Sequence, residues 1–350
     1  MPQFAGRVAT VRRLPPTHSR DPQRGRRGEV GAQQGRRELP LIAAVSLLIL
    51  LGAGPAAAST PQRPLPPRSS DLVAPAPGAS SAQAPLPPPA RLPLGGTQLF
   101  PGHRVVSYWG APALPQTALG KRSPRRAARR LMQAVRRYAL TGERPVVPAI
   151  DLVVTLATRD RGRRGKYSAR LTRRVIRRYL DAARRIGGRL IIDIQPGRSS
   201  LLRELKWHRR WLLEPDVDVA FDPEWNVGRR GVPGQTTGNV RAKTINASSA
   251  WLADLVRANG LPQKALIVHH FRDGSITRRP ELVQPGAPVA LTLNFDGIGS
   301  PAAKVAGYER LQQDTRLYNG FSLFYKLEAP LMPPLDVLAL APESHYVMYQ

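Results

Sequence analysis

Short apolar runs that end in polar residues recur along the chain from about residue 104 onward. Runs of this length and composition predict buried β-strands. Eight such strands can be read, over residues 104–110, 149–157, 189–195, 217–223, 265–271, 289–296, 321–325 and 346–349. Apolar strands that carry polar groups at their C-terminal ends are typical of a (β/α)8 TIM barrel and its active-site face.

Helical periodicity falls between several of these strands, most clearly over residues 124–140, 172–186, 201–213, 247–259 and 301–317. Ser300 followed by Pro301 is a favourable helix start. The connections after the fifth and seventh strands are weak as helices. The same alternation fits an open doubly wound sheet, but no Gly-rich phosphate loop follows the first strand. We therefore expect a (β/α)8 barrel over residues 98–350.

The chain before residue 98 has a different texture. Residues 1–58 combine an Arg-rich start, a short apolar core at 41–51 and the run Ala56-Ala57-Ala58, which together predict a secretory signal peptide. An uncleaved signal anchor is the alternative, although a spanning helix needs about 20 apolar residues. Residues 59–97 are rich in Pro, Ala and Ser and predict an extended linker. The expected location is secreted or attached to the cell envelope, with membrane contact only if the signal segment stays uncleaved.

Composition narrows the possible partners. The 350 residues include 53 Lys and Arg against 24 Asp and Glu, a net charge of +29, and no cysteine. Disulfides and thiolate metal ligands are therefore excluded. The basic runs at 121–130 and 159–178 fall on or beside predicted helices, where a solvated outer face is the first interpretation. Such charge also attracts anionic wall polymers. No zinc finger or other nucleic-acid signature occurs, so no nucleic-acid partner is expected.

The candidate chemistry centres on Asp222 and Glu224, which follow the strand at 217–223. Side chains at i and i+2 on a strand point to the same side. Glycoside hydrolysis uses two carboxyl groups about 5–9.5 Å apart, a spacing that two strand positions can provide. We expect Glu224 to be the acid/base and Asp222 or Asp193 its partner. The alternative is a helix N-cap and a surface acid. Asp151, which opens its predicted strand, is expected towards the bottom of the barrel.

Further polar and aromatic residues at strand ends are expected to bind substrate. They are Tyr108, Trp109, Gln195, Trp225, His269, His270, Asn294, Asp296, Lys326 and Tyr349. Aromatic faces there suit stacking on sugar rings, with core packing as the alternative. His269 and His270 are adjacent, so only one can face the barrel interior. Because neither a His-x-His pair nor an H-E-x-x-H motif occurs, no metal or other cofactor is expected, and a metal-dependent hydrolase is kept as an alternative.

Four segments carry a family resemblance: VVSYWG at 105–110, LIIDIQPGRS at 190–199, FDPEW at 221–225 and VHHF at 268–271. They resemble a family of uncharacterised exported actinobacterial proteins, which implies a signal peptide, a low-complexity spacer and a barrel. FDPEW also resembles the acid-bearing strand ends of glycoside hydrolase barrels. The expected function is an exported glycoside-hydrolase-like protein acting on a cell-envelope or environmental polysaccharide. The alternative partner role is a non-catalytic barrel that binds anionic wall glycan.

Overall fold

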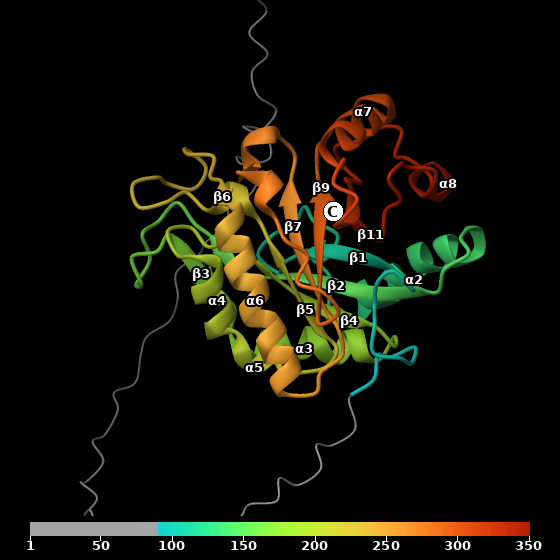
Figure 1. The fold of residues 1–350 in the computed structure, drawn as a ribbon, viewed down its shortest axis with the longest axis horizontal. Helices are drawn as coiled ribbons and strands as arrows, with labels where there is room; N and C mark the ends of the chain where they lie inside the picture. Colours follow the sequence, from blue (N-terminus) through green and yellow to red (C-terminus); the bar gives the residue numbers. More distant parts are fainter. Residues whose placement is uncertain (1–89) are drawn as a thin grey trace, which may run out of the picture. The chain divides into compact units, whose positions relative to one another are not determined.

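A computed structural model describes residues 90–350 of the chain (Figure 1). Eight strands pair in parallel, each with its neighbour, and the pairing of the first with the second and the last closes the circle. The strands are β1 (Arg104–Gly110), β2 (Val146–Ala157), β4 (Arg189–Ile194), β5 (Val217–Phe221), β7 (Lys264–His270), β9 (Val289–Phe295), β10 (Tyr318–Leu323) and β11 (Tyr346–Tyr349). The closed, parallel circle confirms the (β/α)8 barrel.

Three minor strands lie outside this circle. They are β3 (Ser168–Arg170), antiparallel to β2, and the paired β6 (Val240–Arg241) and β8 (Ile276–Thr277). The predicted segment 1–58 and the predicted linker as far as residue 89 lie outside the described residues. The rest of that predicted linker packs against the barrel. Leu92 is buried, and the Thr97 carbonyl accepts a hydrogen bond from the Gln263 backbone N–H at 2.8 Å.

The helices alternate with the strands as the periodicity predicts. They are α2 (Pro124–Thr141), α3 (Arg173–Arg184), α4 (Leu201–Trp207), α5 (Arg209–Leu212), α6 (Ala242–Ala258), α7 (Pro301–Leu311) and α8 (Pro334–Leu338). Ser300 caps α7, as predicted, by accepting a hydrogen bond from the Ala303 N–H. The single helix predicted at 201–213 is wrong in one respect. It is interrupted at His208, whose buried ring contacts Thr155 Oγ1 at 3.1 Å.

The connections after the fifth and seventh barrel strands, β7 and β10, contain little helix in the structure, as the sequence predicts. Between β7 and β9 the helical structure of the described chain is limited to the 3₁₀ turns η2 (Asp273–Ser275) and η3 (Arg279–Glu281). Between β10 and β11 it is limited to the five-residue α8. The barrel is therefore covered unevenly, and loops dominate over its fifth and seventh strands.

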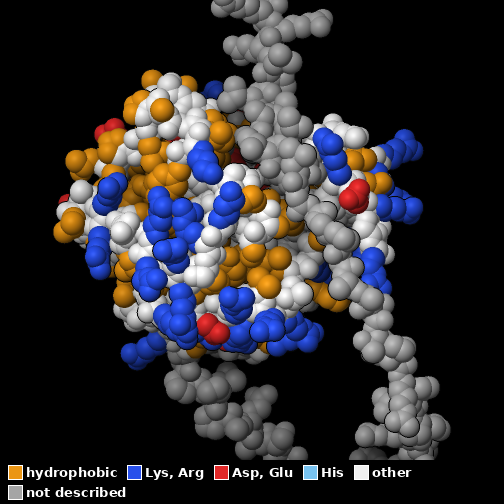
Figure 2. Space-filling view, turned by 180° about the vertical axis from the view of Figure 1, so that it is seen from behind, with side chains coloured by type: hydrophobic (Ala, Val, Ile, Leu, Met, Phe, Trp, Pro, Cys, Tyr) orange, Lys and Arg blue, Asp and Glu red, His pale blue; other side chains and the backbone are white. Residues whose placement is uncertain are grey.

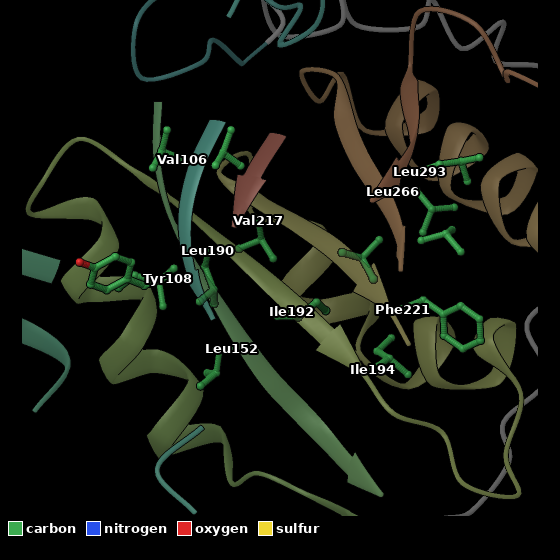
Figure 3. Close-up of a cluster of buried hydrophobic side chains, with 14 of the residues drawn as sticks. Val106, Tyr108, Leu152, Leu190, Ile192, Ile194, Val217, Phe221, Leu266 and Leu293 are labelled. Carbon is green, nitrogen blue, oxygen red and sulfur yellow. The ribbon is translucent and has the colours of Figure 1, made fainter. Parts of the chain in front are cut away.

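Strand alternation divides the apolar core into two layers. Outward side chains such as Val106, Leu190 and Phe221 pack between the barrel and its helices (Figure 3). Inward ones such as Val105, Ile191 and Ala220 fill the lower interior. The backbone N–H groups of Leu99 and Phe100 donate to Gln263 Oε1 at 3.0 and 2.8 Å, just before β7 begins. This segment therefore covers the N-terminal end of the barrel and leaves the opposite end for a site.

Buried cationic side chains at this N-terminal end have direct hydrogen-bond partners, although Arg189 Nη1 has none among the described residues. Arg189 donates to both carboxylate oxygens of Asp218, at 2.5 Å from Nε and 2.8 Å from Nη2. Lys264 Nζ donates to the carbonyls of Glu214 and Val217 at 2.8 and 2.7 Å. One expectation for Asp151 is wrong, because this residue does not open its strand. Because β2 begins at Val146, Asp151 lies inside the barrel, where its Oδ2 accepts the Tyr346 hydroxyl at 2.6 Å.

The basic runs lie on the outside, as the sequence predicts. In α3 the arginines Arg173, Arg174 and Arg178 are exposed while Ile176 and Tyr179 are buried. Figure 2 shows Lys and Arg side chains spread over one face with few acidic side chains among them. Within residues 90–350, no helix combines the length and the apolar character needed to span a membrane.

Candidate functional site

Acidic side chains and one histidine converge inside the C-terminal end of the barrel. Asp193 lies in β4, His269 in β7, and Asp222 directly follows β5. Each offers one ligand atom, and these three atoms lie within 4.8 Å of one another. All three side chains are almost fully buried. Adjacent parallel strands place their C-terminal ends side by side, which brings the three residues together.

Glu224 and Asp296 extend this cluster. One oxygen from each lies within 4.8 Å of the other and of an Asp222 oxygen. Both residues are less buried than Asp222. Asp296 follows β9, and its Oδ2 is 3.7 Å from His269 Nδ1. The cluster thus comprises four carboxylates and one imidazole, and its outer members are the more accessible ones.

The predicted strand geometry of the Asp222–Glu224 pair is wrong. β5 ends at Phe221, and Pro223–Trp225 forms the 3₁₀ turn η1 instead of continuing the strand. The turn, and not the strand alternation, brings Glu224 beside Asp222. Gly238 packs against this turn and donates its N–H to the Glu224 carbonyl at 2.6 Å. A Cβ at Gly238 would lie 2.4 Å from the Asn226 carbonyl oxygen, so only glycine allows this approach.

Hydrogen-bond donors orient part of the cluster. Trp109 Nε1 donates to Asp193 Oδ2 at 2.6 Å, and Gln195 Nε2 donates to Asp222 Oδ2 at 2.8 Å. The Asn294 side-chain amide lies 3.0 Å from His269 Nδ1 and contacts the Ser322 hydroxyl at 2.7 Å. These partners hold one side of each group and leave the other side towards the centre.

The atoms that face the centre lack partners. Asp193 Oδ1, His269 Nε2 and Asp296 Oδ1 are buried and have no hydrogen-bond partner among the described residues. His269 Nε2 is 3.9 Å from Asp222 Oδ1, which is too long for a hydrogen bond. An unsatisfied buried polar atom costs about 1–3 kcal/mol, so several in one place need an explanation.

Burial and mutual repulsion change the proton affinities in the cluster. Burial raises the pKa of Asp193 to about 6 and that of Asp296 to about 7. The pKa of Asp222 is raised well above its ordinary value by burial and then by the Asp193 charge. Burial, followed by the Asp296 charge, also raises the pKa of Glu224. Burial lowers the pKa of His269 to about 3, so its ring is neutral at pH 7. The carboxyl groups of the cluster therefore hold their protons more tightly than free carboxyl groups do, and the nearby Lys304 and Arg272 offset only part of this effect.

Three residues predicted to bind substrate face away from this site. Tyr108 and Tyr349 point outward, with their hydroxyls 3.0 Å from those of Tyr325 and Tyr138 respectively. His270 also points outward, and its Nε2 lies 3.3 Å from Gln312 Oε1. The cause is strand alternation, which turns the neighbouring residues Trp109 and His269 inward. These three residues therefore lie outside the cluster, and their substrate contacts stay predictions from the sequence.

The other residues predicted to bind substrate also fall into two groups, those in the cluster and those outside it. Trp109, Gln195, Asn294 and Asp296 join the cluster, although Trp109 does so as a hydrogen-bond donor and not as a stacking surface. Trp225 is buried within η1. Lys326 is exposed beyond β10, and within residues 90–350 no hydrogen bond or ion pair joins it to the cluster.

Sequence reasoning missed two groups beside the site. Ser322 contacts Asn294 from β10, and its signal was a polar residue inside an apolar run. Lys304 on α7 is buried, donates to the Ser322 carbonyl at 2.5 Å and forms an ion pair with Glu328. A lysine on an amphipathic helix usually reads as exposed, so the pattern contained no signal for it.

Comparison with known proteins gives no family and only a weak structural similarity. No protein-family model matches the chain, and no curated protein matches its sequence. Among solved structures, the chain is similar to a truncated form of 3-deoxy-D-arabino-heptulosonate 7-phosphate synthase from Thermotoga maritima. The TM-score is 0.35 at 11% sequence identity, covering 71% of this chain and 74% of that chain.

The predicted function, a glycoside hydrolase, is corrected. The similar structure is named as a synthase, but at this TM-score its name carries no weight for this chain. The geometry of the site gives a physical reason. A glycosidase places two carboxyl groups about 5–9.5 Å apart across one bond. Here oxygens of Asp222, Glu224 and Asp296 crowd within 4.8 Å, with Asp193 and His269 beside them. The arrangement is a compact set of ligand atoms and not a separated pair.

Proposed function

We propose that this protein is a divalent-cation-dependent (β/α)8-barrel enzyme whose metal centre lies at the C-terminal mouth of the barrel. The observation that carries the proposal is the set Asp193, Asp222 and His269. Their ligand atoms lie within 4.8 Å of one another, and Asp193 Oδ1 and His269 Nε2 are buried without a partner. A cation would satisfy both atoms and offset the buried negative charge.

The donor types indicate which cations fit. Carboxylates suit Mg²⁺, Ca²⁺ and Mn²⁺, while imidazole suits Zn²⁺ and other transition metals, so a mixed set favours Mn²⁺ or Zn²⁺. Ligands on opposite sides of a cation at about 2.1 Å stand about 4.2 Å apart, close to the observed spacing. Because the pKa of His269 is lowered to about 3, its ring is not protonated at neutral pH and has a lone pair to offer.

The neighbouring side chains resemble the outer support of a metal ligand. A coordinating histidine donates its other ring N–H to an oxygen, which fixes the ring. Coordination through His269 Nε2 would place the proton on Nδ1, 3.0 Å from the Asn294 amide. With the amide oxygen turned towards the ring, Asn294 would accept that proton and the Ser322 hydroxyl together.

The chemistry follows from the place of the cation. A divalent cation polarises a bound substrate oxygen and lowers the pKa of bound water. Glu224 and Asp296 are the more accessible members of the cluster, so substrate would approach past them. Catalytic residues of (β/α)8 enzymes come from this same end of the barrel. The proposed reaction class is metal-assisted activation of a substrate oxygen or of water.

Calorimetric titration of the full chain with Mn²⁺ and with Zn²⁺, after treatment with a chelator, tests the proposal. We expect saturable binding that is abolished or weakened at least tenfold in Asp193→Asn and in His269→Gln. Asp273→Asn is the matched control, because this acid lies after β7 but its side chain is 79% exposed. Absence of binding by the native chain, or equal weakening in the control, would overturn the proposal.

We further propose that the protein is exported, as the signal-peptide pattern at residues 41–58 indicates. The test is N-terminal sequencing of the mature protein from the producing cell. A chain that begins after Ala58 supports cleavage and export, and a cytosolic chain that retains residues 41–51 contradicts it. A wall-glycan partner stays a prediction from the sequence.

A further inference from the structure

A second set of ligand atoms lies beside the first and shares one residue with it. Asp222, Glu224 and Asp296 each offer an oxygen, and these oxygens lie within 4.8 Å of one another. Asp222 also belongs to the set with Asp193 and His269. Its Oδ2 accepts from Gln195, while its Oδ1 lies 3.9 Å from His269 Nε2. A carboxylate shared by two such sets has the position of a bridging ligand.

An independent observation points into the second set. The side chain of Asp296 is only 9% exposed, yet its Oδ1 is buried without a partner among the described residues. The cationic side chains near it are engaged elsewhere. Lys304 pairs with Glu328 and donates to the Ser322 carbonyl, and Arg272 donates to the Gly238 carbonyl at 3.0 Å.

The charge of the cluster also favours two cations. Four carboxylates and a neutral histidine carry four negative charges when they are ionised. One divalent cation would leave half of this charge in a low-dielectric interior, where unpaired charges are costly. A second cation would neutralise the remainder without recruiting another side chain.

We propose that the centre binds two divalent cations, one held by Asp193, Asp222 and His269 and the other by Asp222, Glu224 and Asp296, with Asp222 bridging them. This inference rests on the proposed function, since it adds a second cation to the first. In centres of this type the two cations lie about 3.5–4 Å apart and act on one substrate together. Glu224 and Asp296, the less buried members of the cluster, place the second cation on the substrate side.

The test is the number of Mn²⁺ ions bound per full chain, measured by equilibrium dialysis with elemental analysis, and paired with electron paramagnetic resonance. We expect two ions in the native chain and a spectrum broadened by coupling between them. Asp296→Asn should bind one ion, lose the coupling and keep the affinity of the remaining site within about threefold. Asp273→Asn should behave as the native chain. Circular dichroism confirms that each variant is folded.

The outcomes separate the two proposals. One ion per native chain, or two ions without coupling, overturns the dinuclear centre and leaves the proposed function standing. Two coupled ions in Asp296→Asn overturn the assignment of the second site. No bound ion in the native chain overturns both proposals. If Asp296→Asn fails to fold, Glu224→Gln provides a second variant of the same site. It should also bind one ion.

Discussion

The two ends of the same three strands handle buried charge in opposite ways. At the N-terminal end of β4, β5 and β7, Arg189 forms a two-point ion pair with Asp218, and Lys264 donates to two backbone carbonyls. At the C-terminal end, Asp193 of β4, Asp222 after β5 and the neutral His269 of β7 approach one another. At the first end the cations bond directly to the buried acceptors, whereas at the second end the nearby Lys304 and Arg272 bond to other groups.

This difference distinguishes buried polar groups that stabilise the fold from buried polar groups that serve a site. A buried ion pair whose oxygens are all engaged needs nothing from outside the chain. In a buried cluster of carboxyl groups with unpartnered atoms, the pKa of each group is raised and the fold is less stable. Such clusters are typical of functional sites. The N-terminal end therefore supports the barrel, and the C-terminal end is where we propose the functional site.

Breaking the ion pair at the N-terminal end should have the largest effect. Asp218→Ala leaves the buried Arg189 uncompensated, which typically costs about 3–5 kcal/mol. Asp193→Asn at the other end removes an unfavourable carboxylate and should leave the stability in chelator unchanged or higher. Urea denaturation at pH 7.5 measures both. Equal destabilisation by the two variants would remove the distinction between the ends.

The pH dependence of Asp296→Asn should sharpen the comparison. The pKa of Asp296 in the folded chain is raised to about 7 from 3.8, so the folded state holds its proton more tightly than the unfolded state does. The native chain in chelator therefore loses stability as the pH rises from 4 to 7. The asparagine variant lacks this loss. Its advantage should be near zero at pH 4 and grow to at most about 4 kcal/mol above pH 7.

Denaturation at a series of pH values, with both proteins in chelator, gives this difference directly. An advantage that stays constant between pH 4 and pH 7 would contradict the raised pKa. Asp314→Asn is the opposite control, because the Arg316 contact lowers the pKa of Asp314. That variant should lose stability relative to the native chain above pH 4, and not gain it.

Cation binding should raise the stability of the fold, and it should do so only through the ligands at the C-terminal end of the barrel. A ligand at about 100 times its Kd raises the free energy of unfolding by about 2.7 kcal/mol. Mn²⁺ should therefore raise the Tm of the native chain, and it should have no such effect on Asp222→Asn, which lacks the shared ligand. Differential scanning calorimetry is the measurement. The same shift in both proteins would place the cation elsewhere.

The smallest expected effect belongs to Trp109→Phe. The substitution keeps an aromatic ring but removes the N–H that donates to Asp193 Oδ2. Partners that orient a metal ligand typically contribute 10- to 100-fold in affinity, so Mn²⁺ should bind about tenfold more weakly. Titration calorimetry compares the two proteins. Unchanged affinity would mean that Trp109 serves packing only.

The barrel could be predicted from the sequence because each strand is a separate apolar run with its own boundaries. The polar strand ends also predicted Asp193, Asp222, Glu224 and Asp296 as site residues. Two features could not be predicted from the sequence. The turn at η1 depends on Gly238, fourteen residues beyond Glu224, and no local pattern shows that contact. The ligand sets depend on which strands are neighbours in space.

The direction in which each strand side chain points also determines the role of individual residues. Trp109 and Tyr108 read alike as aromatic residues at a strand end, but only Trp109 faces inward. The same applies to His269 and His270. The sequence predicted that only one of the two histidines faces the interior, and the closed barrel shows which member of each pair does.

The most direct test of the central claim is anomalous X-ray diffraction from crystals of the full chain grown with Mn²⁺. The account predicts an anomalous peak about 2.0–2.3 Å from an oxygen of Asp193, an oxygen of Asp222 and Nε2 of His269. The same peak should be missing in crystals of Asp222→Asn. A well-ordered cluster without any peak, or a peak only at surface carboxylates such as Asp273, would contradict it.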